Sequence, residues 1–447
     1  MTVAVRRTLD SLTVPNYRRY FAGQIVSITG NWMQMVAEAW LIIQLTGSGA
    51  ALGLTVGLQF LPILLLGALG GVFVDRCDKR RLLMITQALM ALPALALWGL
   101  TASGAVEVWM VYLLVLTRGV VLAVDNPARQ TFVMELVGPD KVVNAVSLNS
   151  VIIHSARIAG PMFAGGLIAL FGVAPAFLVN ALSFAAMIVA LRGMDRGRLL
   201  TPARAPRSRG QVRAAVAEVR RNPDLRIPLL MMAAIGTLSF NFQVLLPLFA
   251  KFTWNGTATT YATLMAAMGV GAIAGALISG FRGNVSARLL VSSAALFGVA
   301  QLLAAAAPTE WAQLLVLVPL GAASVMFAAG VNSSLQLAAG EMRGRVMALY
   351  SVVFLGSTPI GAPIVGVLAE QFGPRWGLVV GGVAALATAG VASVAYARAA
   401  AAAAAAPPAS SESWTCKTES SSCGSSEVRP RATSRETTTS VAPTAAR

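Results

Sequence analysis

The chain has 447 residues, of which 56% are hydrophobic and only 12% are charged, and its mean hydropathy is +0.71. A soluble domain carries about 25% charged residues, so this composition points away from a soluble globular protein. The formal net charge of +16 would suggest nucleic-acid binding in a soluble protein. Here the basic residues lie between long apolar stretches. At such positions they would face the anionic headgroups of lipids, which explains the positive charge. No nucleic-acid partner is therefore expected.

Twelve apolar windows follow one another along the chain, and each approaches or exceeds the roughly 20 residues that cross a bilayer as a helix. The sequence therefore predicts an all-α polytopic membrane protein with twelve transmembrane helices. The windows are Phe21–Leu45, Ala50–Val74, Leu82–Ala105, Val108–Val124, Ala145–Leu170, Val173–Leu191, Ile227–Ala250, Tyr261–Phe281, Leu289–Ala307, Trp311–Leu337, Val346–Ala369 and Trp376–Ala397.

The basic residues are distributed unequally between the two sides of these windows. Of 34 Lys and Arg residues, Lys251 and Arg375 fall in loops on one side, Arg118 and Arg157 fall inside windows, and the other thirty lie in the termini or on the opposite side. Cytoplasmic loops carry such an excess of positive charge. We therefore expect a multi-pass protein of the cytoplasmic membrane with both termini in the cytoplasm.

A basic segment between the sixth and seventh windows divides the chain into two similar halves. Shifting the fifth window by 201 residues places Gly160, Gly165 and Phe171 on Gly361, Gly366 and Phe372 in the eleventh. Such parallel repeats are typical of transporters whose two bundles rock against each other. Gln211–Arg221 is interpreted as a helix on the inner membrane surface. The expected organisation is an N-terminal segment (1–20), a first six-helix bundle (21–191), a cytoplasmic linker (192–226), a second six-helix bundle (227–397) and a Ser/Thr-rich disordered tail (398–447).

Ionisable residues inside the windows are few, and each costs on the order of 3 kcal/mol at the bilayer centre. They are Glu38, Arg118, His154 and Arg157, and Asp125 lies at the inner end of the fourth window. They form neutralising pairs, Glu38 with Arg118 or with Arg157, or a titratable site that takes up and releases a proton during transport. The second interpretation makes Glu38, Arg118, His154 and Arg157 the candidate proton-coupling residues.

The segment SARIAGPMFAGG puts helix breakers into the fifth window. Ala156, Gly160 and Ala164 recur every four residues, a pattern that lets another helix approach closely. Pro161 removes a backbone hydrogen bond, which is tolerable where neighbouring helices cover the freed carbonyl. A closely packed, bent helix with an arginine near the membrane midplane is typical of a gate between bundles.

These motifs resemble the major facilitator superfamily. Ala156, Gly160, Pro161, Ala164 and Gly165 resemble its antiporter signature. GGVFVDRCDKRR is similar to its loop between helices two and three, although Asp78 replaces the customary glycine. VLTRGVVLAVDNPARQ, GTLSFNFQVLLPLF and RGRVMALYSVVFLGSTPIGAPIVG resemble the drug/proton antiporter branch that includes enterobactin exporters and bacterial multidrug and macrolide exporters. In that branch AQDW commonly ends helix one, whereas this chain has AEAW at 37–40, which moves the acid to Glu38.

The resemblance implies roles for residues that spacing alone does not assign. It implies that Arg118 matches the helix-four arginine linked to proton movement. It also implies a cytoplasmic charge network and gate that latches the outward-open state, formed by Gly71, Asp75, Arg76, Lys79, Arg80, Asp125 and Arg129.

The function predicted from the residues and the resemblance together is proton-coupled efflux of amphipathic small molecules, such as an antibiotic, secondary metabolite or siderophore. Ion coupling is expected because the chain has no G-x-x-x-x-G-K-[ST] nucleotide motif, and no cofactor or metal site and no enzyme activity is expected. A facilitator or symporter that imports a nutrient, sodium in place of protons, and a non-transporting receptor or scaffold remain alternatives, and a monomer is expected. The predicted substrate cavity combines aromatic and neutral polar side chains: Trp32, Gln34, Trp40, Phe240, Asn241, Gln243, Asn332 and Gln336.

Overall fold

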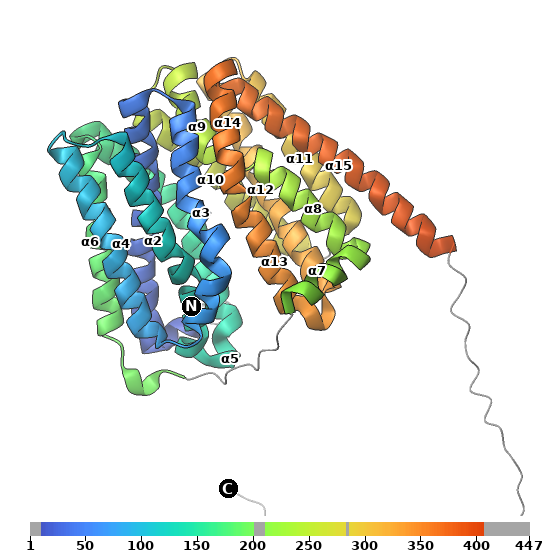
Figure 1. Cartoon of the computed structure of the whole chain (residues 1–447), viewed down its shortest axis with the longest axis horizontal. Coiled ribbons are helices and arrows are strands. Elements are labelled where there is room, and N and C mark those ends of the chain that lie inside the picture. The colour runs from blue at the N-terminus through green and yellow to red at the C-terminus, as the bar shows by residue number, and fades with distance from the viewer. Residues whose placement is uncertain (1–9, 201–210, 283–285, 406–447) are drawn as a thin grey trace, which may run out of the picture. The chain divides into compact units, whose positions relative to one another are not determined.

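The computed structural model describes residues 10–200, 211–282 and 286–405, and the regular elements of these residues are helices (Figure 1). The predictions for residues 1–9 and 406–447, which include most of the expected tail, lie outside the described residues. The elements are η1 (Asp10–Thr13), α2 (Pro15–Thr46), α3 (Gly49–Val74), α4 (Lys79–Ala102), α5 (Val108–Phe171), α6 (Ala174–Arg192), η2 (Arg196–Arg198), α7 (Gln211–Arg221), α8 (Pro223–Leu238), α9 (Phe242–Leu248), η3 (Phe249–Thr253), α10 (Ala258–Arg282), α11 (Ala287–Ala306), α12 (Glu310–Ala338), η4 (Gly340–Met342), α13 (Arg343–Gly356), α14 (Thr358–Phe372) and α15 (Pro374–Ala405).

Each of the twelve predicted windows coincides with one or more helices. Ten helical stretches of the described residues are long and apolar enough to cross a membrane, and α2 covers the first window in addition. The long helix α5 holds both the fourth and the fifth windows, which meet at a break at Gly138 (φ 74°, ψ 176°) followed by Pro139. The fourth helix therefore continues about four turns beyond the predicted end at Val124, because glycine and proline, and not the loss of hydropathy, end it.

The seventh and eleventh windows are interrupted, although the sequence predicted continuous spans. Residues Ser239–Asn241 separate α8 from α9, and Ser357 separates α13 from α14. At the first break Gln301 Nε2 donates to the Ser239 carbonyl (2.8 Å), and Ser239 Oγ donates to the Gly381 carbonyl (2.7 Å). Neighbouring helices thus form hydrogen bonds with the polar groups at this break, which would cost free energy if they were left unpaired in an apolar environment.

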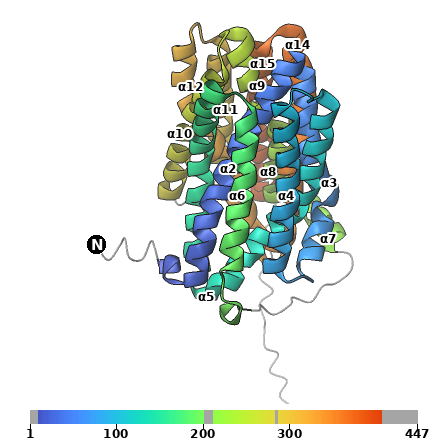
Figure 2. The same ribbon diagram turned by 90° about the vertical axis from the view of Figure 1, so that its left-hand side faces the viewer.

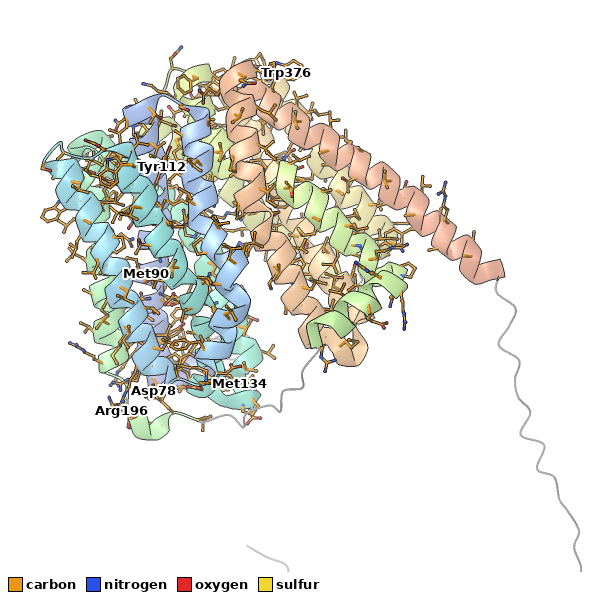
Figure 3. The ribbon with its side chains drawn as sticks, viewed as in Figure 1. Asp78, Met90, Tyr112, Met134, Arg196 and Trp376 are labelled. Carbon is orange, nitrogen blue, oxygen red and sulfur yellow. The ribbon has the colours of Figure 1, made fainter. Side chains whose placement is uncertain are left out.

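The helix ends divide into two sets, which we call the basic end and the opposite end. Asp78 and Arg196 mark the basic end, whereas Tyr112 and Trp376 lie toward the opposite end (Figure 3). We call α2–α6 the first half and α8–α15 the second half. In the first half α4 and α6 lie side by side (Figure 2), and α2 packs against α6 and α5.

The two halves contact each other through symmetry-related helix pairs. Helix α14 of the second half packs along α3 of the first, and α10 of the second half packs along the later part of α5. At the opposite end Ser48 Oγ and the Ala50 amide donate to Glu370 Oε2 (2.5 and 2.7 Å), and Thr259 Oγ1 donates to the Gly165 carbonyl (3.4 Å). In this conformation the halves are therefore joined at the opposite end.

The segments outside the two bundles differ partly from expectation. Helix α7 occupies the predicted residues Gln211–Arg221 and packs against α8 and α13. The predicted start of the disordered tail at residue 398 is wrong for its first residues, because α15 continues through Ala405. That stretch is almost entirely alanine, the residue with the highest helix propensity.

Candidate functional site

A buried ion pair joins two helices inside the first half. Glu38 on α2 and Arg118 on α5 are 3% and 2% exposed, and Arg118 Nη2 donates to Glu38 Oε2 at 2.8 Å. The other carboxylate oxygen accepts from Gln34 Nε2 at 2.7 Å, and Gln34 in turn accepts from Asn180 on α6. Arg118 Nε and Nη1 are buried without a hydrogen-bond partner. The carboxylate is thus held by one cation and one amide, and the cation keeps unused donors.

The other two candidate coupling residues lie apart from this pair. The Arg157 guanidinium lies over the Trp32 ring, 5.4 Å from its centroid, and His154 Nδ1 is buried without a partner. In the described residues no hydrogen bond or ion pair connects either side chain to Glu38. Of the two partners that the sequence allowed for Glu38, the structure pairs it with Arg118.

A second buried pair lies nearer the basic end. Arg129 Nε donates to Asp125 Oδ2 at 2.5 Å, and Asp125 Oδ1 accepts from Thr86 Oγ1 (2.6 Å) and Gln87 Nε2 (2.9 Å). Arg129 also donates to Gln24 and to Ser27, both on α2. This network connects α2, α4 and α5, and the sequence prediction named only its two charged members.

The first residues of α4 and the loop before them make a third set of polar contacts. Lys79 Nζ forms an ion pair with Glu135 (2.5 Å), and Arg80 donates to the carbonyls of Leu191 (2.7 Å) and Arg192 (2.9 Å). Asp78, which replaces the customary glycine, accepts from the Arg81 amide at 3.0 Å and caps α4. The remaining predicted members differ in their surroundings: Asp75 and Arg76 are exposed beyond the end of α3, and Gly71 lies inside that helix.

The predicted antiporter helix is closely packed. Ala156, Gly160, Pro161, Ala164 and Gly165 are all buried on α5. A Cβ on Gly160 would meet Trp32 and the Thr29 carbonyl of α2, and one on Gly165 would meet Ala262 of α10. The first glycine therefore permits packing within the half, and the second permits packing between the halves. The only non-helical backbone within α5 is at Gly138, so Pro161 lies within a continuous helical stretch.

A pocket lies between the two halves near Arg157. The first half contributes Trp32 and Arg157, and the second half contributes Phe240, Phe242 and Gln243 from the interrupted seventh window and Met265 and Met268 from α10. Gln243 Oε1 is buried and has no hydrogen-bond partner. Phe240 packs against Phe297 (5.0 Å between ring centroids) and Phe354 (5.9 Å), so this wall is aromatic and fixed by its neighbours. The pocket thus combines one cation, one amide and an apolar wall.

Sequence comparison assigns the architecture to a family. A family model described as "Transmembrane secretion effector" matches residues 7–420. The chain belongs to this family. The family match and the transporter relatives agree with the resemblance to the major facilitator superfamily drawn from the motifs, and the chain is a multi-pass membrane transporter of that type, not an enzyme.

Curated relatives of this chain are transporters. It is 25% identical over 260 residues to the staphyloferrin A transporter of Staphylococcus aureus (strain NCTC 8325 / PS 47), a match that covers 58% of this chain and 65% of the relative. It is 23% identical over 369 residues to macrolide efflux protein A of Streptococcus pyogenes (81% of this chain, 91% of the relative). It is also 25% identical over 356 residues to the multidrug efflux pump Tap of Mycolicibacterium fortuitum (77% and 87%).

Solved structures with the same fold support the architecture. A bacterial homologue of the human lysosomal transporter Spinster, in an inward-facing and unoccupied conformation, has a TM-score of 0.69 at 14% identity, with 86% of this chain and 98% of that chain covered. A bacterial homologue of the iron transporter ferroportin, in an inward-facing state, has a TM-score of 0.64 at 17% identity, with 85% and 98% covered. At these identities the likeness shows the fold alone.

The predicted cavity residues divide into two groups. Trp32, Phe240 and Gln243 line the pocket. The others have different surroundings: Gln34 lies in the Glu38 network, Trp40 is in the hydrophobic core, Asn241 Nδ2 donates to the Thr237 carbonyl (2.7 Å), and Gln336 Nε2 donates to Asn332 (2.5 Å).

Sequence reasoning missed several residues of the site. Glu135, Gln24, Ser27, Thr86 and Gln87 complete the charge networks, and they are polar residues within or beside apolar stretches. Met265 and Met268 line the pocket from one face of α10, as the spacing i, i+3 allows. The five polar residues could have been recognised from their position near the ends of apolar windows. The two methionines lie in an apolar helix, where nothing in the sequence distinguishes them.

Proposed function

We propose that this protein exports an amphipathic small molecule across the cytoplasmic membrane in exchange for protons that enter the cell, by alternating access. The observation that carries the proposal is the buried ion pair between Glu38 and Arg118 inside the first half. An ionised carboxylate in such a place is costly unless it is paired, and intramembrane acids are typical of proton pathways.

Protonation of Glu38 would change the electrostatics of the bundle interior. A neutral carboxyl group no longer neutralises Arg118, and an arginine cannot itself lose its proton. Two further nitrogens of Arg118 already lack partners, so the unpaired cation would need new acceptors or a rearranged bundle. Proton occupancy at Glu38 would thereby favour one arrangement of the halves over the other.

The contacts at the opposite end indicate what must change during the cycle. Release on that side requires α3 to separate from α14 and the later part of α5 to separate from α10. The hydrogen bonds from Ser48, Ala50 and Thr259 would then break. We place the basic end in the cytoplasm from the charge asymmetry, so the opposite end faces outward. Both halves and the pocket belong to one chain, which supports a monomer as the working unit.

The relatives support export and the class of cargo. A macrolide efflux protein and a multidrug efflux pump match most of the chain, and a staphyloferrin A transporter matches over half of it. The pocket's aromatic and thioether wall would accommodate an apolar portion of such a molecule.

The test uses everted membrane vesicles with an acidic lumen. Accumulation of a panel of amphipathic probes, which includes the cations erythromycin and ethidium and the anion 1-naphthylacetate, is measured together with luminal pH. We expect accumulation coupled to proton exit, and we expect Glu38→Gln to lower pH-driven accumulation by about tenfold or more while probe binding persists. Glu107→Gln, at an exposed glutamate before α5, is the matched control and should transport normally.

The outcomes separate the proposal from its alternatives. Accumulation that follows an imposed sodium gradient but not a pH gradient would show that sodium, and not the proton, is the coupling ion. Uptake in the opposite direction would indicate a symporter. Unchanged pH-driven accumulation in Glu38→Gln would remove this carboxylate from the mechanism.

A further inference from the structure

Arg157 differs from the other buried or half-buried arginines and lysines of the first half, each of which is bound by an acceptor of the protein. Arg80 donates to two backbone carbonyls. Arg118, Arg129 and Lys79 each lie beside a carboxylate, at 2.8, 2.5 and 2.5 Å. Among the described residues Arg157 makes no ion pair, and it contacts instead the face of Trp32. A ring face attracts a cation weakly compared with a carboxylate, so the guanidinium retains its full capacity to bind an anion.

The acids within the helices of this region are already engaged. Glu38 is bound by Arg118 and Gln34, and Asp125 by Arg129, Thr86 and Gln87. An arginine within a membrane bundle stays protonated and is costly without a counter-charge. A counter-charge for Arg157 can therefore come from a molecule in the pocket that it lines.

The rest of the pocket indicates what else such a molecule carries. Phe240, Phe242, Met265 and Met268 provide an apolar wall from the second half, opposite Trp32 and Arg157. Gln243 Oε1, buried and without a partner, is a hydrogen-bond acceptor for an N–H or O–H group. The cation and the apolar wall come from different halves, so one molecule that satisfies both would bridge them.

We propose that the substrates are amphipathic organic anions in which one carboxylate is attached to an apolar, aromatic-sized body. The carboxylate binds the Arg157 guanidinium, held in orientation by Trp32, and the body lies against Phe240, Phe242 and the two methionines. Gln243 accepts a hydrogen bond from a polar group on that body. This inference rests on the proposed function and specifies its substrate class.

A matched pair of probes tests the inference. Tritiated 1-naphthylacetate and 1-naphthylacetamide share one ring system and differ in charge, and their binding to the purified full-length chain in nanodiscs is measured by scintillation proximity. We expect the acid to bind about tenfold more tightly than the amide, as a charge-assisted hydrogen bond allows. Arg157→Gln should abolish this preference while the amide binds as before, and Arg157→Lys should retain part of it.

A second arginine over a tryptophan provides the control. Arg375 lies 5.7 Å from the Trp254 ring centroid and donates to the Ala305 carbonyl, away from the pocket. Arg375→Gln should leave the preference for the acid intact. The inference is overturned if the wild-type protein fails to bind the acid or binds both probes equally, or if Arg157→Gln weakens both probes alike.

Transport of the same two probes separates this inference from the proposed function. In proteoliposomes with an imposed pH gradient, equal transport of acid and amide would leave proton-coupled export standing and overturn the anion preference. Selective binding of the acid without pH-driven transport of either probe would support the anion preference and would overturn proton-coupled export.

Discussion

The two halves of the molecule share a helix order and a packing scheme but bury different polar chemistry. The first half buries two ion pairs, Glu38 with Arg118 and Asp125 with Arg129. The buried polar residues of the second half are all neutral among those that the structure describes: Ser239, Asn241, Ser293, Gln301, Gln313, Ser324 and Ser357. Repetition of the architecture has therefore left the interior chemistry free to diverge.

The difference indicates a division of labour. Buried ion pairs contribute little net stability, because desolvation offsets their attraction, so packing alone does not account for two of them in one half. Neutral groups such as Gln313, which accepts from Trp254 Nε1 at 2.5 Å, satisfy helix contacts without a charge. We interpret the first half as the site of proton coupling and the second half as the apolar wall for the substrate.

Removal of one charge should therefore harm the first half far more than removal of a neutral polar group harms the second. We expect Asp125→Asn to lower the free energy of unfolding by about 3 kcal/mol, because Arg129, whose side chain is 11% exposed, remains without its counter-charge. Gln313→Leu should cost about 1 kcal/mol, the net value of one hydrogen bond. Unfolding of the detergent-solubilised protein measures both.

The double variant Asp125→Asn with Arg129→Gln is the control for this charge effect. It should recover most of the stability lost in Asp125→Asn, since no unpaired charge remains. Equal losses in Asp125→Asn and Gln313→Leu would contradict the division between the halves.

The two halves share their helix packing, so substitutions of glycines at repeat-related positions should have equal effects on stability. A Cβ on Gly160 would meet α2, and one on Gly361 would meet the Thr237 carbonyl of α8. We expect Gly160→Ala and Gly361→Ala each to lower the free energy of unfolding by about 2 kcal/mol through overpacking. Thermal unfolding of the two variants, side by side, measures the loss.

Glycines in open space provide the matched controls for this pair. A Cβ on Gly166 or Gly390 would meet no neighbouring atom within 4 Å. Alanine at either position should be neutral or should stabilise its helix by up to about 1 kcal/mol. A large loss at Gly160 with none at Gly361 would show that the two helix contacts are not equivalent.

The sequence predicted the helices well because length and hydropathy determine them, but it did not predict every break. Gly138 and Pro139 mark the break in α5, and Gly356 lies directly before the break at Ser357. Ser239–Asn241 interrupts the seventh window three residues after Gly236, and the break itself contains no glycine or proline. Gln301 on another helix satisfies the Ser239 carbonyl there. A contact between distant segments is not visible in local composition.

The candidate site was predictable in its members but not in its pairings. The rise per residue along a helix predicts the depth of Glu38, Arg118 and Arg157 in the membrane. Because the two arginines lie at similar depth, the sequence could not decide which of them pairs with Glu38. Rotation about each helix axis decides between them, and packing sets that rotation. Glu135 was missed for a related reason, since it lies beyond the predicted end of the fourth window on a helix that continues.

The smallest expected effect concerns a charge that the second half presents to the first. Glu370, exposed near the end of α14, accepts from Ser48 Oγ and from the Ala50 amide and so caps α3 across the boundary between the halves. Loss of such a cap costs about 1 kcal/mol, which corresponds to about a fivefold change in an equilibrium. Glu370→Ala should therefore lower the ratio of closed to open opposite ends by about that factor.

Pulsed electron paramagnetic resonance between spin labels at Thr46 and Phe372 measures this shift, because these residues end α2 and α14 on either side of the contact. Glu370→Gln should have an intermediate effect, since its amide oxygen still accepts a hydrogen bond. Glu310→Ala, at a glutamate in the first turn of α12, should leave the distances unchanged. Identical distance distributions in wild type and Glu370→Ala would mean that α3–α14 packing alone holds the opposite end closed, so that the second half's charge has no part in the gate.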